Sequence, residues 1–152
     1  MAPPDRYDMH VERVFEFTDE IFDAILGLIP HLTSNKSLPT REEIASLIKS
    51  ESSTLWVARH PDQNGEIAGI LTIALYRVPT GLRSIVEDVV VNPNFRRLGI
   101  ARALLQTAIN FAHQTGANGV ALTSNPKREA ANLLYQTMGF ERRETNSYFY
   151  RL

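Results

Sequence analysis

The sequence predicts an α/β protein with a mixed, mostly antiparallel sheet that is covered by helices on both faces. Stretches that are rich in β-branched residues, and are either alternating or continuously apolar, recur along the chain and are typical of strands. Stretches with helical spacing of apolar residues stand between them, most of them behind a capping residue. The 152 residues are enough for one domain with its own core, so a single domain over residues 1–152 is expected.

The chain opens with a strand and two helices. Residues 10–18 alternate between apolar and polar side chains and predict a strand. Thr18 then caps a helix whose apolar stripe ends before Pro30, because proline cannot continue a helix. Thr40 and Glu43 form the capping box of a second helix.

Three strands and a long helix follow. The strands are expected at residues 54–59, 67–77 and 82–91. An Asn-Gly pair within residues 62–66 favours a tight hairpin between the first two, and residues 78–81 turn the next. The helix carries apolar residues along one face, namely Ile100, Leu104, Leu105, Ala108, Ile109 and Ala112.

The last third adds a strand, a helix and a hairpin. Residues 119–124 are almost wholly apolar, as in a strand buried on both sides. Asn125 is a good N-cap for a helix that runs to about Met138. Residues 140–152 are expected to form a terminal hairpin that turns near residues 144–146. The predicted order is β-α-α-β-β-β-α-β-α-β-β.

The composition excludes several kinds of function. The net charge of −1 gives no basic surplus, so no nucleic-acid partner is expected. Cysteine is absent, which excludes disulfides, thiolate metal sites and a cysteine nucleophile. The four histidines have no metal-ligand spacing, so no metal is expected.

The apolar stretches are short. None approaches the roughly 20 residues that a membrane span needs, so no membrane association is expected. The first ten residues contain no apolar segment typical of a signal peptide. A cytoplasmic location is therefore expected, with the nucleus left open.

The junction at residues 89–101, VVVNPNFRRLGIA, carries the clearest chemical signal. A helix start offers backbone N–H groups without partners and the positive end of the helix dipole, so it suits phosphate. Gly99 lets a ligand approach the backbone closely, and Arg96 and Arg97 add charge-assisted hydrogen bonds. The alternative is a plain loop with two solvated arginines. The stretch is neither a Walker loop nor a complete G-x-G-x-x-G motif.

Two motifs resemble the GNAT superfamily of acetyl-CoA-dependent N-acetyltransferases. Arg96, Gly99 and Ala101 fit its [Arg/Gln]-x-x-Gly-x-[Gly/Ala] signature, which follows the fourth strand. Tyr135, four residues before Gly139, fits a second signature on the last helix. The order of elements also matches, so the resemblance covers nearly the whole chain and implies the GNAT fold. The chain departs from many members at Arg97 and Ala101, where they have glycine.

The resemblance implies a site for acetyl-CoA. A bulge in the strand before the loop would leave a slot in which the backbone of Val89, Val90 and Val91 pairs with the pantetheine amides. The loop and helix start would bind the pyrophosphate through Arg96, Arg97, Leu98, Gly99, Ile100 and Ala101. Asn125, Arg128 and Asn132 would contact the cofactor from the far side, although Asn125 could simply cap its helix and Asn132 could be an ordinary exposed residue.

The resemblance also implies catalytic residues. An amine would attack the thioester directly, and a backbone N–H of the bulged strand would stabilise the oxyanion. Tyr135 would protonate the leaving thiolate. Glu87 and Asp88 are the candidates for the base, and the stretch around them locally resembles glucosamine-6-phosphate N-acetyltransferases. Adjacent strand residues point to opposite faces, so only one of the two reaches the slot in a regular strand. Asp88 is the favoured contact, and plain solvated carboxylates are the alternative.

His31, Tyr76 and Arg77 are expected at the acceptor side, together with Glu87 and Asp88. Arg77 could pair with an acidic group of the acceptor. The expected function is acetyl transfer from acetyl-CoA to a primary amine of a small molecule. The alternatives are a protein or peptide N-acetyltransferase and a non-catalytic acyl-CoA-binding sensor. The acceptor, the acyl-chain preference, the choice of base and the oligomeric state, with a homodimer among the options, stay open.

Overall fold

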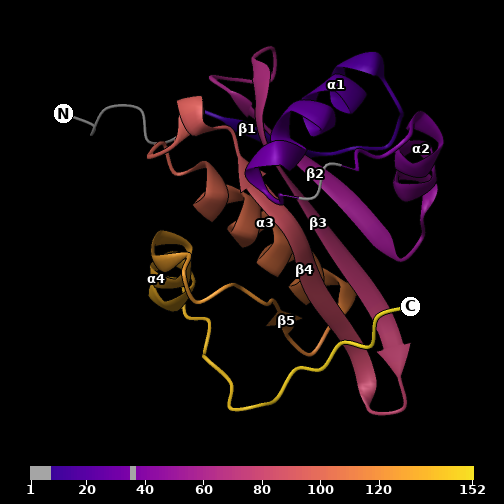
Figure 1. The fold of residues 1–152 in the computed structure, drawn as a ribbon, viewed down its shortest axis with the longest axis vertical. Helices are drawn as coiled ribbons and strands as arrows, with labels where there is room; N and C mark the ends of the chain where they lie inside the picture. The colour runs from indigo at the N-terminus through magenta and orange to yellow at the C-terminus, as the bar shows by residue number, and fades with distance from the viewer. Residues whose placement is uncertain (1–7, 35–36) are drawn as a thin grey trace. The chain divides into compact units, whose positions relative to one another are not determined.

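The computed structural model describes residues 8–34 and 37–152 (Figure 1). Residues 1–7, part of the stretch without signal-peptide character, lie outside that description. The chain divides into two compact units, Met1–Leu122 and Thr123–Leu152, and each is described by itself. The expectation of a single domain stays a prediction.

The first unit is built on one five-stranded sheet. Its strands follow the order of the sequence across the sheet. The first four are antiparallel to their neighbours, and the last pairs parallel to the fourth, which confirms the mixed, mostly antiparallel sheet. The strands are β1 (His10–Arg13), β2 (Ser53–His60), β3 (Glu66–Val78), β4 (Gly81–Val91) and β5 (Val120–Ala121).

The helices of this unit begin where the sequence predicts. The Thr18 hydroxyl accepts a hydrogen bond from the Ile21 N–H, and the Thr40 hydroxyl accepts one from Glu43. Each bond satisfies one of the free N–H groups at a helix start. The helices are α1 (Asp19–Leu28), α2 (Arg41–Lys49) and α3 (Ile100–Thr115), with the short 3-10 helices η1 (Ile29–His31) and η2 (Pro93–Phe95).

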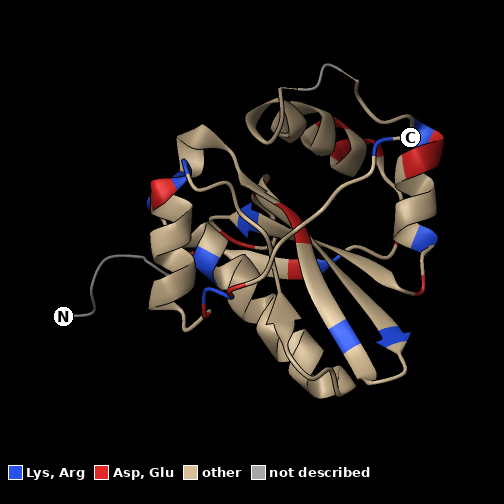
Figure 2. Ribbon diagram, turned by 60° about the horizontal axis from the view of Figure 1, so that its bottom comes forward, with Lys and Arg blue, Asp and Glu red and all other residues tan. Residues whose placement is uncertain are grey.

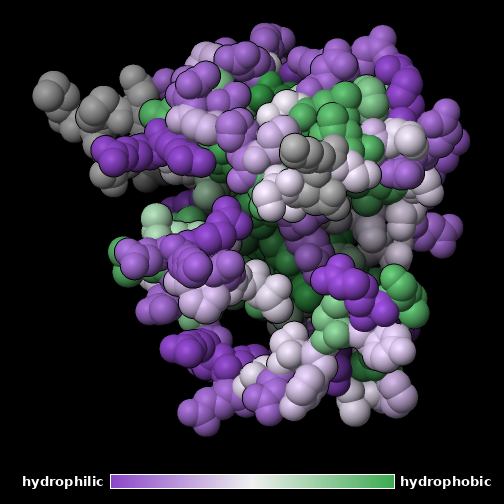
Figure 3. Space-filling view, in the orientation of Figure 1, coloured by the Kyte–Doolittle hydropathy of each residue, from purple (hydrophilic) through white to green (hydrophobic). Residues whose placement is uncertain are grey.

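Helices cover both faces of this sheet. Apolar residues of α1 and α2 share a core with Leu55, Val57 and Val90 on one face, and apolar atoms gather between these helices in the space-filling view (Figure 3). On the other face, Trp56 packs edge-on against Phe111 of α3, with ring centroids 5.4 Å apart. Neighbouring strand residues point to opposite faces, so even and odd positions of β2 are divided between the two layers.

Strands β3 and β4 form a hairpin that continues past β2. The register pairs Ser53, the first residue of β2, with Ala74, so β4 is the only strand that pairs with the last four residues of β3. Of these four, Leu75 still donates its N–H to the Ser52 carbonyl, at 2.7 Å. The hairpin runs on beyond α1 and α2 (Figure 1). One sheet face of its outer part is therefore left without a covering helix from this unit.

The second unit contains α4 (Glu129–Thr137). This helix begins four residues after Asn125, which was expected to cap it. The Asn125 side chain instead accepts from the Lys127 N–H at 2.9 Å, and its carbonyl accepts from the Arg128 N–H at 3.0 Å. These bonds close a turn before the helix, and Arg128 becomes the N-cap. Gly139, with φ of 98°, ends the helix region as predicted.

The predicted terminal hairpin is wrong. Residues 140–152 contain no strand, and Tyr148, Phe149 and Tyr150 are each more than four-fifths exposed. An isolated two-stranded hairpin is marginal at best, and this stretch lacks the Asn-Gly or Asp-Gly pair that favours a tight turn. The preceding strand is also shorter than the predicted 119–124, so it offers few backbone groups for further pairing.

Within the described residues, every helix is too short or too polar to cross a membrane.

Candidate active site

Strand β4 contains a bulge at the position where the resemblance implies one. Thr72 pairs with Glu87 and Ile70 pairs with Val90, so the single residue between them on β3 faces two residues of β4, Asp88 and Val89. Asp88 has a φ of 53°, in the left-handed region that non-glycine residues seldom adopt. A bulge of this kind re-aims backbone groups and ends regular alternation.

Glu87 and Asp88 differ in their position relative to the bulge. Glu87 is cross-strand to Thr72, and therefore lies on the sheet face that α1 and α2 cover elsewhere. Asp88 sits in the irregular step, so alternation does not assign it to a face. Both side chains are exposed. Of the two carboxylates, only Glu87 has a face fixed by the regular register.

The outer edge of β4 is open along the bulge. Strand β5 pairs with β4 only at Ser84 and Ile85. From Val86 to Val91 no described strand lies along that edge. An unpaired strand edge presents a row of N–H and C=O groups that can pair with an extended ligand. The backbone of Val89, Val90 and Val91 is therefore positioned like an edge that accepts an added strand.

The loop after β4 leads into an uncapped helix start. Gly99 is the N-cap of α3 with φ of 80°, and it has no side chain to bond the first turn. In the part of the chain that the structure describes, no acceptor is seen for the N–H groups of Ile100, Ala101 and Arg102. The first turn holds no acidic residue. These free donors and the helix dipole together favour an anion.

Three arginines surround this helix start. Arg96, Arg97 and Arg102 are exposed, and none makes an ion pair with a described carboxylate. Arg97 also has a left-handed backbone, with φ of 66°. The sequence analysis missed Arg102, although its position in the first turn of the predicted helix could have identified it. The arrangement has the free donors, the positive charge and the close backbone approach that a pyrophosphate group requires.

Residues of β2 and β3 contact the loop and hold it in place. The ring of His60 lies 5.5 Å from that of Phe95 in η2, and the Asn92 N–H donates to the Ala68 carbonyl at 2.7 Å. Asn92 also accepts from the Asn94 N–H through its side chain. Contacts between segments far apart in the sequence hold the loop, so the sequence analysis could not anticipate His60 and Phe95.

In the second unit, polar side chains hold the turn before α4. Asn132 donates from its side-chain amide to the Asn125 carbonyl at 3.0 Å. This bond spans the turn, whose Asn125 side chain bonds Lys127. The oxygen of the Asn132 amide and the amino group of the Asn125 amide make no hydrogen bond to described residues. Asn125 and Asn132 thus each make a hydrogen bond that holds the turn, and each keeps one polar atom of its side-chain amide without a described partner.

Tyr135 lies half-buried on α4. Burial raises the pKa of its phenol, and the nearby positive charge of Arg128 partly opposes that rise. Its ring packs edge-on against Phe140, with centroids 6.0 Å apart. The hydroxyl is therefore protonated at neutral pH, as in an ordinary tyrosine, and it carries the proton that a donor needs.

Residues 15–140 match the model of the acetyltransferase (GNAT) family. The chain belongs to this GNAT family. It is 33% identical over 105 residues to N-acetyltransferase family 8 member 3 of Rattus norvegicus, a match that covers 68% of this chain and 44% of that protein. It is 34% identical over 98 residues to the probable N-acetyltransferase camello of Xenopus tropicalis, covering 64% and 42%. The chain thus spans less than half the length of these relatives.

Solved structures confirm the GNAT fold. An aminoglycoside acetyltransferase from an uncultured soil metagenomic sample, in complex with sisomicin, superimposes with a TM-score of 0.81 at 21% identity, over 95% of this chain and 96% of that one. AAC(6')-Iy, in complex with the bisubstrate analogue CoA-S-monomethyl-acetylneamine, has a TM-score of 0.74 at 17% identity, over 95% and 98%. At these identities the likeness concerns the fold alone.

The residues predicted for the acceptor side of this GNAT fold are divided by the sheet register. Tyr76 pairs with Arg83 and lies on the same face as Glu87, whereas Arg77 lies on the opposite face, where α3 packs. Basic residues mark the outer end of the β3–β4 hairpin (Figure 2). His31 ends η1 and is exposed. The sequence analysis chose Arg77 and missed Arg83, because only the register distinguishes their faces.

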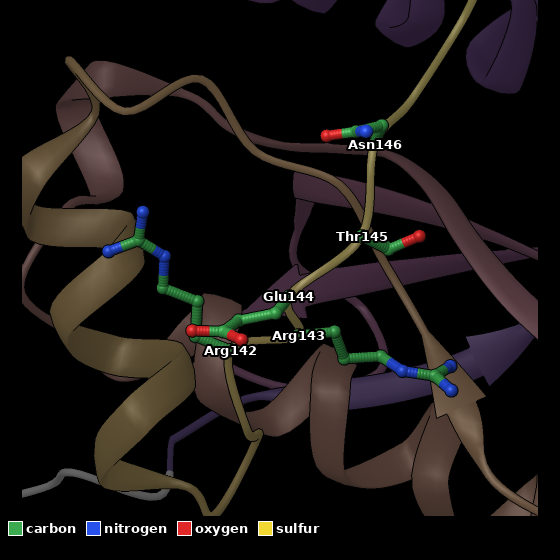
Figure 4. A pocket seen from close by; sticks show the side chains of 5 residues that line it. All are labelled: Arg142, Arg143, Glu144, Thr145 and Asn146. Carbon is green, nitrogen blue, oxygen red and sulfur yellow. The ribbon is translucent and has the colours of Figure 1, made fainter.

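One further concavity lies in the second unit. Residues 142–146 line it, and Figure 4 shows Arg142 and Arg143 pointing away from each other. All its lining residues come from one short segment, so it brings no distant side chains together. No group of His, Asp or Glu side chains in the described ranges is arranged to hold a metal ion.

Proposed function

We propose that this GNAT chain transfers the acetyl group of acetyl-CoA to a primary amine of a small molecule. One observation carries the proposal: the open edge of β4 leads directly into the uncapped, arginine-rich start of α3. An edge that can pair with an extended amide chain, next to a cluster of donors for phosphate, matches the two chemical parts of coenzyme A.

Each part of the site has a role in this proposal. Val89, Val90 and Val91 pair through their backbone with the pantetheine amides. The segment from Arg96 to Ala101 binds the pyrophosphate, and Arg102 adds to its positive field. Asn125, Arg128 and Asn132 contact the cofactor, a role that rests on the resemblance and on the polar atoms left free after their own bonds.

The proposed chemistry needs a base, an oxyanion donor and an acid. Glu87 takes a proton from the ammonium group of the acceptor, which frees the nitrogen lone pair for attack on the acetyl carbon. Asp88, the contact favoured from the sequence, becomes the alternative base, because the bulge leaves its side chain without a face set by the register. A backbone N–H at the bulge stabilises the oxyanion. The carbon–sulfur bond then breaks, and Tyr135 donates its proton to the leaving thiolate. The nitrogen loses its second proton as the amide forms, and a proton returns from solvent to the Tyr135 phenolate.

A small-molecule acceptor is favoured over a protein. The relatives' names give N-acetyltransferases without stating the acceptor, whereas solved structures of the same fold contain small amines such as sisomicin. A peptide acceptor and a sensor without turnover are the competing proposals. The match of Tyr135 to the second family signature supports catalysis over mere binding, because that tyrosine carries the proton for the leaving thiolate.

Thermal unfolding and an amine screen test the proposal. Acetyl-CoA at about 100 times its Kd adds about 2.7 kcal/mol, which corresponds to a rise in Tm of roughly 5–10 °C for a chain of this size. ATP at the same concentration controls for unspecific anion binding. Release of CoA is then followed with small amines and with peptides. No shift with acetyl-CoA would refute the cofactor site, and a shift without turnover on any acceptor would favour the sensor.

A further inference from the structure

The outer part of the β3–β4 hairpin presents an ordered series of side chains on the face of Glu87. We call this surface the acceptor floor, and it consists of three cross-strand pairs: Thr72–Glu87, Ala74–Ile85 and Tyr76–Arg83. From the bulge outward, the floor changes from a carboxylate to small and apolar side chains and then to an aromatic ring beside a guanidinium.

The floor is accessible within its unit. The helices α1 and α2 pack over the inner part of this face, where Val57, Ile70 and Val90 belong to the core. Farther out, Ala74 and Ile85 are half-buried, whereas Arg83 is exposed and Tyr76 is 42% exposed. At Tyr76 and Arg83 the hairpin extends beyond the first residue of β2, which pairs with Ala74, and it continues past α1 and α2 (Figure 1).

Arg83 has a free positive charge on this floor. Its guanidinium donates one hydrogen bond, to the Thr80 hydroxyl at 3.0 Å. No described carboxylate makes an ion pair with it. The bond to Thr80 holds the side chain near the outer end of the hairpin and leaves the remaining N–H groups for an anion, which a guanidinium binds well.

From this order we infer that the acceptor is an amine with an anionic group at its far end and an apolar part between them. The inference rests on the proposed acetyl transfer, because it takes Glu87 as the end where the amine reacts. Glu87 and Arg83 are four residues apart on one strand, which corresponds to about 13 Å along β4. An acceptor that reaches both groups has its amine and its anion separated by a distance on the order of 10 Å, since both side chains are long.

The positive charge of the floor also disfavours a polycationic acceptor. An acceptor with several amines would place a positive group next to Arg83, and like charges repel. The ring of Tyr76 and the side chain of Ile85 instead offer an apolar surface for the middle of the acceptor. Arg83 thereby becomes a residue that determines specificity, without a part in the bond-making step.

Kinetics with matched acceptors test the inference. A series of linear ω-amino carboxylates of increasing length is compared with the corresponding ω-amino amides, at saturating acetyl-CoA. The carboxylates should have the higher kcat/KM, by up to about fivefold for an exposed charge pair, and the advantage should grow with length toward the expected separation. Added salt should reduce this advantage, because it screens exposed charges.

Two variants, each of which removes one positive charge, test whether Arg83 causes the preference for carboxylates. Arg83→Gln should remove the preference for carboxylates over the matched amides. Arg77→Gln removes the same charge from the opposite face of the same hairpin, and it should keep the preference. Circular dichroism confirms that both variants are folded.

The outcomes separate this inference from the proposed function. If amides and carboxylates react equally well, if Arg83→Gln keeps the preference, or if Arg77→Gln abolishes it, the inference is overturned while acetyl transfer stands. If acetyl-CoA binds but no amine of either series reacts, the inference is overturned, and the proposed function fails with it only if the wider panel of amines and peptides is also unreactive.

Discussion

Two glycines at opposite ends of α3 provide a matched test of the cofactor loop. Gly99 precedes the helix with φ of 80° and ψ of 14°, and Gly116 follows it with φ of 85° and ψ of 17°. The two backbones are nearly identical and left-handed, yet only Gly99 lies in the proposed phosphate site. We therefore compare Gly99→Ala with Gly116→Ala.

The cost in stability should be similar for the two variants. A left-handed backbone costs an L-residue roughly 1–2 kcal/mol. The stiffer unfolded chain returns roughly 0.4–1 kcal/mol when glycine is replaced by alanine. A Cβ at position 116 meets no atom within 4 Å, so no clash adds to the strain there. The net loss is about 1 kcal/mol, or a decrease in Tm of roughly 2–4 °C for a chain of this size.

Cofactor affinity should separate the variants. At position 99 the new methyl group stands where the pyrophosphate approaches the free N–H groups of the first turn, so binding should weaken by about tenfold or more, equivalent to about 1.4 kcal/mol. Gly116→Ala should bind acetyl-CoA like the unchanged protein. Calorimetric titration measures the affinity, and urea unfolding without ligand measures the stability.

Two results would refute the assignment of the start of α3 to the pyrophosphate. Unchanged affinity in Gly99→Ala, at the expected loss of stability, would show that phosphate does not contact this loop. An equal decrease in affinity for both variants would attribute the effect to general destabilisation of α3. Either result contradicts the assignment of the helix start to the pyrophosphate.

Three further predictions concern catalysis and stability. Tyr135→Phe should lower turnover by roughly 10–100-fold, the lower part of the range for general acid catalysis, with little change in acetyl-CoA affinity; steady-state kinetics paired with titration would detect a full-rate variant that contradicts the role. Glu87→Gln should reduce kcat/KM more than Asp88→Asn does, and equal, near wild-type rates would remove both from the mechanism. Arg59 bonds both Glu20 oxygens at 2.7 and 3.0 Å, and Arg59→Met should destabilise the fold by about 1–3 kcal/mol at neutral pH. Because Arg59 lowers the pKa of Glu20 from its ordinary 4.5, this part of the stabilisation is present above that value and is lost as the pH falls through the lowered pKa. The difference in stability between the two proteins should therefore narrow in acid without closing, since Arg59 also donates to Glu12 and to the Gly65 carbonyl, at 2.8 and 3.0 Å. Unfolding curves at neutral and acidic pH measure it, and a difference that is the same at both pH values would contradict the pairing.

Local signals in the sequence determined most of the helices and strands and the loop that we propose to bind the cofactor. Thr18 and Thr40 cap their helices through bonds to residues three positions away, so the sequence alone contains both partners. The segment from Val89 to Ala101 is likewise continuous, and its strand, loop and helix start occur as predicted. Interactions between neighbours in the sequence need no knowledge of the fold.

Local patterns gave wrong predictions where the structure depended on which groups were available to pair with them. The alternating residues of 140–152 resemble a hairpin, but a strand forms only against an edge that accepts it. Asn125 is a good cap by residue type, yet it bonds Lys127 and closes a turn instead. Both patterns had a competing local solution, and residue type does not reveal which of the two is more stable.

The tertiary structure alone decided which side chains share a sheet face with Glu87. Arg77 and Arg83 have the same charge and lie on adjacent strands, and only the pairing of Tyr76 with Arg83 places the second of them beside Glu87. The bulge at Asp88 then breaks the alternation on which a sequence argument depends. A shift of one residue in register would move every side chain of the strand to the opposite face. Which arginine lies on the face of Glu87 therefore depends on strand pairing, and the sequence alone does not contain it.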